Sequence, residues 1–97
     1  MLKIYIACLE KKDYEKLKSI CDSYEAENII EPTEYYLSYT HKGKKQAKRL
    51  KSHWSARIEP FILIEKDGKA VKAFYSEASK DIINDFKHFM EYELDTI

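Results

Sequence analysis

Residues that interrupt regular structure are scarce in this 97-residue chain, which has two glycines, two prolines and two cysteines. The scarcity of glycine and proline predicts that most of the chain forms helices and strands. Two cysteines do not make a disulfide scaffold, so a small cross-linked fold is not expected. The two glycines, Gly43 and Gly68, lie far apart, which excludes a glycine-rich phosphate loop.

Long apolar runs are also missing. No run approaches the 18 residues that a membrane-spanning helix needs, and no basic, apolar leader opens the chain. We therefore expect a cytoplasmic protein with reduced thiols that does not associate with membranes. The apolar fraction of 44% can supply one modest core, and the length fits a single domain over residues 1–97.

Acidic residues are absent from one long stretch. The 17 basic and 17 acidic residues cancel overall, but residues 35–58 contain seven Lys or Arg, two His and no acid. The remainder carries ten basic and 17 acidic residues, a net charge of −7. Such asymmetry can mark a partner surface, whereas the simpler interpretation is one solvated basic helix.

Apolar periodicity predicts four elements in the first half of the chain. Leu2–Cys8 alternates as a strand does and is apolar enough to be almost wholly buried. Lys11–Ala26 has apolar residues at helical spacing, and the tyrosine-rich segment Glu34–Thr40 favours a strand. Lys44–Trp54 is predicted to form a short helix that follows Gly43.

The second half is predicted to contain a hairpin and a final helix. The strands Phe61–Glu65 and Ala70–Tyr75 flank Asp67-Gly68, a strong hairpin turn sequence. Ser79–Tyr92 carries an apolar helical stripe, with Ser76 or Ser79 as the expected cap. The resulting order β-α-β-α-β-β-α predicts an α/β fold whose four-stranded mixed sheet has helices on both faces. A ferredoxin-like sheet would need a different order.

This order of elements resembles the thioredoxin fold, in thioredoxins and glutaredoxin-like proteins. The resemblance is strongest in Arg57-Ile58-Glu59-Pro60-Phe61-Ile62-Leu63-Ile64 and Asp67-Gly68-Lys69-Ala70-Val71. In thioredoxins a proline opens the third strand, a turn with glycine follows, and an amphipathic helix closes the fold. The resemblance implies that Pro60 is cis and faces the active-site groove. Small proteins of this kind occur in phages and mobile elements, where they often engage host machinery.

The paired cysteines of thioredoxin-like oxidoreductases are missing here. In that family a Cys-x-x-Cys motif lies between the first strand and the first helix. One alignment places Glu10-Lys11-Lys12-Asp13 over the motif, with no cysteine. The other places Cys8-Leu9-Glu10-Lys11 there, so that only the first cysteine remains. Neither alignment allows dithiol redox chemistry.

Cys8 therefore has two interpretations. As a monothiol nucleophile, its thiolate would be stabilised by Lys11 or Lys12 and by the helix N-terminus, and it would accept glutathione or form a mixed disulfide. As a strand-ending core residue, it would be inert. Without a reactive Cys8 no cofactor is expected. Cys21 lies on an apolar stripe and is expected in the core.

We favour a non-catalytic module that binds an unidentified protein. Its surface would be the groove formed by Glu59, Pro60, Lys11 and Lys12, or the tyrosine-rich second strand beside the basic helix. We expect Glu59 to pair with Arg57 or Lys11. The chain is expected to be a monomer or a weak homodimer.

Two other hypotheses stay open. One is a monothiol redox or glutathione-linked enzyme that uses Cys8. The other is nucleic-acid binding by the basic helix within residues 42–57, with Trp54 or Tyr39 stacking on a base. A pI of 6.8 argues against nucleic acid. No metal site is expected, since His41, His53 and His88 lack ligand-like spacing. The basic face consists of Lys44, Lys45, Lys48, Arg49 and Lys51.

Overall fold

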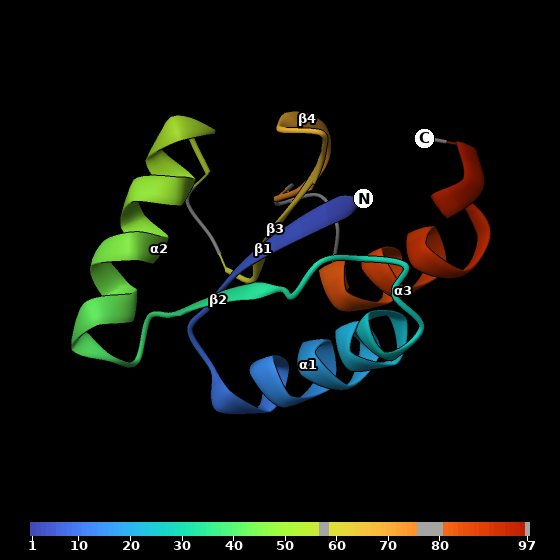
Figure 1. The fold of residues 1–97 in the computed structure, drawn as a ribbon. Coiled ribbons are helices and arrows are strands. Elements are labelled where there is room, and N and C mark those ends of the chain that lie inside the picture. Colours follow the sequence, from blue (N-terminus) through green and yellow to red (C-terminus); the bar gives the residue numbers. More distant parts are fainter. Residues whose placement is uncertain (57–58, 76–80, 97) are drawn as a thin grey trace.

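The computed structural model describes residues 1–56, 59–75 and 81–96. Strands and helices alternate along the chain until the hairpin, which is followed by the last helix (Figure 1). The elements are β1 (Leu2–Cys8), α1 (Lys11–Ala26), β2 (Glu34–Leu37), α2 (His41–His53), β3 (Phe61–Lys66), β4 (Lys69–Phe74), α3 (Ile82–Tyr92) and a short 3-10 helix (Leu94–Thr96).

The four strands form one mixed sheet in the order β2-β1-β3-β4. β1 and β2 are parallel, whereas β3 runs antiparallel to both of its neighbours, β1 and β4. α1 and α3 lie on one face of the sheet and α2 lies on the other (Figure 1). The predicted α/β fold, a four-stranded mixed sheet with helices on both faces, is confirmed.

The two faces of the sheet carry cores of unequal size. Because successive strand residues point to opposite faces, Ile4 and Ile6 of β1 join the large core, while Ala7 joins the small one. The large core fills the space between the sheet, α1 and α3. The small core lies under α2, and its buried members are Ala7, Ala47, Phe61 and Leu63. α2 therefore packs on a smaller buried core than the one that α1 and α3 share.

The predicted bounds of β1 and α1 are confirmed, but β2 is shorter and α2 begins earlier than predicted. β2 ends at Leu37 rather than at Thr40, because Thr40 caps α2: its side-chain oxygen accepts a hydrogen bond from the Gly43 backbone N–H at 3.0 Å. α2 starts at His41 instead of Lys44, so Gly43 lies inside its first turn.

The hairpin turn is confirmed, and the start of α3 is corrected. Asp67 and Gly68 have φ values of 53° and 80°, a left-handed pair that suits a tight hairpin. α3 begins at Ile82, where the Asp81 carboxylate accepts a hydrogen bond from the Asn84 backbone N–H at 2.9 Å. The predicted caps, Ser76 and Ser79, lie outside the described residues.

Candidate functional site

The peptide bond between Glu59 and Pro60 is cis, as predicted, and lies directly before β3. The Glu59 carboxylate beside it is 7% exposed and has two partners from other segments. Ser38, just after β2, donates its hydroxyl to one carboxylate oxygen at 2.7 Å. Lys51 of α2 donates its ammonium to the other oxygen, also at 2.7 Å. We call Ser38, Lys51 and Glu59 the Glu59 cluster.

The Glu59 cluster corrects the partner expected for this carboxylate. The pairing with Lys11 is wrong, since Lys51 and Ser38 occupy both carboxylate oxygens; the other expected partner, Arg57, lies outside the described residues. Lys12 instead lies 3.5 Å from Glu10 in the first turn of α1, and both Lys11 and Lys12 are exposed. In the groove predicted around Pro60, the carboxylate of Glu59 is thus already paired with Lys51 and Ser38.

Cys8 is a fully buried residue at the end of β1, packed in the large core. Burial, and after it the nearby negative charges of Asp13 and Glu59, raise the pKa of its thiol to about 12. A monothiol nucleophile needs an accessible thiol with a lowered pKa, and Cys8 meets neither condition. Cys21 is also free and buried in the large core, as predicted.

We predict that Cys8 resists alkylation in the folded chain. Iodoacetamide at pH 8, followed by peptide mass mapping, should label neither Cys8 nor Cys21 until a denaturant unfolds the chain. Cys8 of the folded chain should stay unlabelled even at pH 9, because the pKa of its buried thiol is raised to about 12, whereas a free thiol titrates near 8.5. Fast labelling of Cys8 alone at pH 7 would contradict the burial and restore the monothiol hypothesis.

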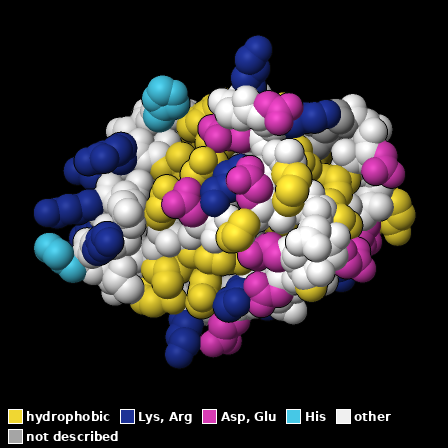
Figure 2. All heavy atoms as spheres, in the orientation of Figure 1, with side chains coloured by type: hydrophobic (Ala, Val, Ile, Leu, Met, Phe, Trp, Pro, Cys, Tyr) yellow, Lys and Arg dark blue, Asp and Glu magenta, His cyan; other side chains and the backbone are white. Residues whose placement is uncertain are grey.

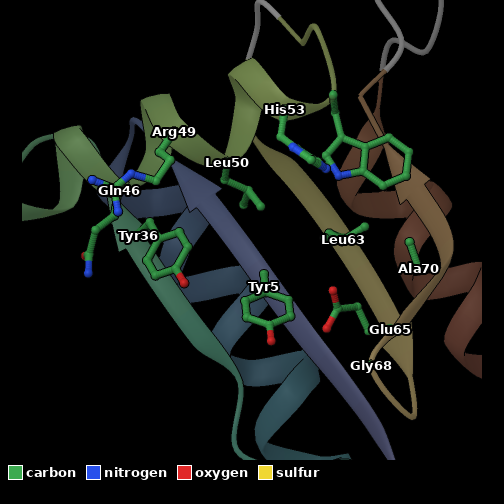
Figure 3. A pocket seen from close by; sticks show the side chains of 11 residues that line it. Tyr5, Tyr36, Gln46, Arg49, Leu50, His53, Leu63, Glu65, Gly68 and Ala70 are labelled. Carbon is green, nitrogen blue, oxygen red and sulfur yellow. The ribbon is translucent and has the colours of Figure 1, made fainter.

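The predicted basic face divides into two parts. Lys44, Lys45 and Lys48 are exposed on α2, and Figure 2 shows basic side chains without acidic neighbours over this helix, whereas acidic and basic side chains are mixed over the rest of the visible surface. Lys51 does not belong to the exposed face, because its side chain is 18% exposed and bonded to Glu59. Arg49 is exposed but turns toward the sheet, where it lines a groove (Figure 3).

This groove lies between α2 and the sheet face that α2 only partly covers. Its volume is about 570 Å³. Tyr5 and Tyr36 rise from β1 and β2, and Leu50 points down from the helix between the two walls (Figure 3). We call it the sheet groove; its lining residues are Tyr5, Tyr36, Gln46, Arg49, Leu50, His53, Trp54, Leu63, Glu65, Gly68 and Ala70.

The sheet groove has opposite charges on its two sides. Arg49 and His53 extend from α2, whereas Glu65 stands on β3 (Figure 3). Burial raises the pKa of the Tyr5 hydroxyl, and the charge and hydrogen bond of Glu65 raise it further. The pKa of Tyr36 is raised by burial and then by the carboxylates of Glu34 and Glu65. Both tyrosine hydroxyls are therefore neutral hydrogen-bond donors close to carboxylates.

The sequence predicts part of the sheet groove but not the contribution of Tyr5. The tyrosine-rich second strand beside the basic helix was a predicted surface, and Tyr36 and Arg49 belong to it. Tyr5 was assigned to a strand that is nearly all buried, but it is partly exposed because α2 covers only one end of this face. The alternation of Tyr5 with buried Ile4 and Ile6 was the available signal, since it places Tyr5 on the opposite face.

Neither a metal centre nor a membrane-spanning helix is found in the part of the chain that the structure describes. In residues 1–56, 59–75 and 81–96, no three His, Cys, Asp or Glu side chains are grouped so that they could hold a metal ion. None of the helices in these ranges is long and apolar enough to cross a membrane. No protein-family model matches the chain, and no curated protein matches its sequence.

Proposed function

We propose that this chain is a thioredoxin-like module that binds another protein and does no dithiol redox chemistry. The sheet order β2-β1-β3-β4, with β3 antiparallel, two helices on one face and one on the other, supports the thioredoxin-like assignment. The cis bond before β3 supports it too. The helix end that would carry the paired cysteines has Glu10-Lys11-Lys12-Asp13, and the nearest thiol is buried.

The observation that carries protein binding is the sheet groove. The groove is partly open and has a volume of about 570 Å³, a size that small-molecule clefts also have, so its volume alone does not identify the occupant. Tyr5, Tyr36 and Trp54 line it, and Tyr, Trp and Arg are the residues that contribute most to protein interfaces, because each combines a large contact area with a polar group. Tyr36 and Trp54 are half-buried, so a partner could contact the exposed part of each ring without a change in the fold.

A photo-cross-linking comparison tests this proposal. We expect benzoylphenylalanine in place of Tyr36 to give discrete protein adducts in extracts of the native cells. The matched control carries the same substitution at Tyr92, a 70% exposed tyrosine of α3 on the other side of the sheet, and should give background only.

Two outcomes would overturn the proposal. Adducts equal at both positions would mean that the groove is not the binding surface. Adducts at Tyr36 whose added mass is removed by nuclease would indicate nucleic acid, which the exposed lysines of α2 would then explain. Circular dichroism of both variants establishes that they fold.

A further inference from the structure

The charges of the sheet groove restrict what can occupy it, if the groove binds a protein as proposed above. Arg49 is exposed and, within the described residues, forms no ion pair. It lies on the α2 wall beside Gln46 and His53 (Figure 3). A guanidinium in this position has all its donors available, and it binds a carboxylate through two parallel hydrogen bonds.

The opposite side of the groove favours a cation. Glu65 is half-buried on β3 and accepts a hydrogen bond from the Tyr5 hydroxyl. Glu34 adds a second carboxylate at the start of β2, outside the groove lining, where it lies 3.9 Å from Lys3. That lysine also stacks over the Tyr5 ring, at 5.9 Å from its centroid, so it is already engaged. The floor between the two charged sides is apolar and aromatic, formed by Leu50, Leu63 and the tyrosine rings.

We infer that the sheet groove binds a peptide segment of the partner protein with an acidic residue toward Arg49, a large apolar residue over Leu63, and a basic residue toward Glu65. An alternating pattern of this kind matches the groove in charge and in polarity along its width.

A nucleic-acid strand fits the same groove less well. Its phosphates would be attracted by Arg49, but they would also approach Glu65 and Glu34, and like charges at close range in a partly desolvated groove repel strongly. The two tyrosine rings are also tilted by 39° at a centroid separation of 6.5 Å, so they do not present one flat stacking platform. A peptide can supply both charges, which a polyanion cannot.

Selection from a random 12-residue peptide library, displayed on phage against the intact immobilised chain, tests this inference. We expect the enriched peptides to carry an acid and a base on either side of an aromatic or large aliphatic residue. A synthetic peptide of that consensus should lose affinity by about tenfold with Arg49→Glu and with Glu65→Lys. Selection against Arg49→Glu should enrich a base in place of the acid.

The matched control is Lys45→Glu, which makes the same charge change on the outer face of the same helix, away from the groove lining. It should change affinity less than about twofold. An equal loss with Lys45→Glu would overturn the inference, since binding would then follow overall charge. So would competition by a single-stranded oligonucleotide at equal concentration.

The selection also separates this inference from the proposed function. Peptides that lack the two charges, yet are lost with Tyr36→Ala, would refute the charge pattern and leave protein binding in the groove intact. Selection of no peptide, together with no adduct at Tyr36, would refute both.

Discussion

Replacing Glu59 with alanine is expected to lower the free energy of unfolding by about 3 kcal/mol. The loss arises because the variant removes one half of a partly buried ion pair and leaves the other half in place. The Lys51 ammonium, on a side chain that is 18% exposed, loses its counter-charge, and the Ser38 hydroxyl loses its acceptor. Urea denaturation followed by circular dichroism measures the change, which for a chain of this size also lowers Tm by roughly 4–8 °C per kcal/mol.

The exposed ion pair between Lys18 and Asp22 provides the control. These residues are 2.9 Å apart on α1, with side chains about half exposed, and Asp22→Ala should cost only about 0.5 kcal/mol. Glu59→Gln keeps an acceptor for Ser38 and should lie between the two. Equal losses for Glu59→Ala and Asp22→Ala would mean that burial does not strengthen the Glu59 cluster.

Replacing Gly43 with alanine is expected to destabilise the fold by about 2 kcal/mol, although alanine is normally the better helix residue by about 1 kcal/mol. A Cβ at this position would overlap the Leu37 carbonyl oxygen and lie 2.6 Å from the Leu37 nitrogen and from the Thr40 side-chain oxygen. The first two are backbone atoms, which cannot turn away as a side chain can. The helix must therefore shift from the end of β2 or lose its cap.

Helix propensity alone predicts that Gly→Ala stabilises a helix, so a loss of stability in Gly43→Ala would have the opposite sign. Ser52→Ala, at an exposed position of the same helix, should leave stability unchanged or raise it slightly, as propensity alone predicts. Thermal unfolding of both variants at one pH compares them directly. A Gly43→Ala protein as stable as the parent would show that the first turn of α2 has room for a methyl group beside the Leu37 backbone.

Sequence alone predicted the elements in which a local pattern determines the structure. Alternation fixed β1, helical spacing fixed α1, and the left-handed pair Asp67-Gly68 fixed the hairpin, since each of these patterns is complete within a few residues. The sequence predicts that Gly43 precedes α2, and glycine is a poor residue for a helix interior. Its close contact with Leu37 explains why glycine occupies a helical turn here, and that contact exists only in the folded chain.

The candidate site was harder to predict because it depends on distances between segments. Lys51 and Glu59 are eight residues apart, which is not a helical pairing distance, and they meet only after the chain turns back from α2 into β3. Lys51 was accordingly assigned to the solvated basic face. The sheet groove likewise depends on how far α2 extends over the sheet. The sequence indicated the tyrosine-rich strand and the basic helix that line the groove. It did not indicate that Tyr5 and Glu65 line the groove too.

The small core under α2 has a consequence for how the groove can adjust. α1 and α3 share the large core, whereas α2 is held by the few buried residues around Ala47 and, near its C-terminal end, by the Glu59 cluster. α2 is also tied to neighbouring segments at both ends, by the close approach of Gly43 to Leu37 in its first turn and by the bond from Lys51 to Glu59. The groove wall that α2 forms is therefore held at both ends, so the groove adjusts to a partner mainly through the rotamers of exposed side chains such as Arg49 and not through movement of the helix.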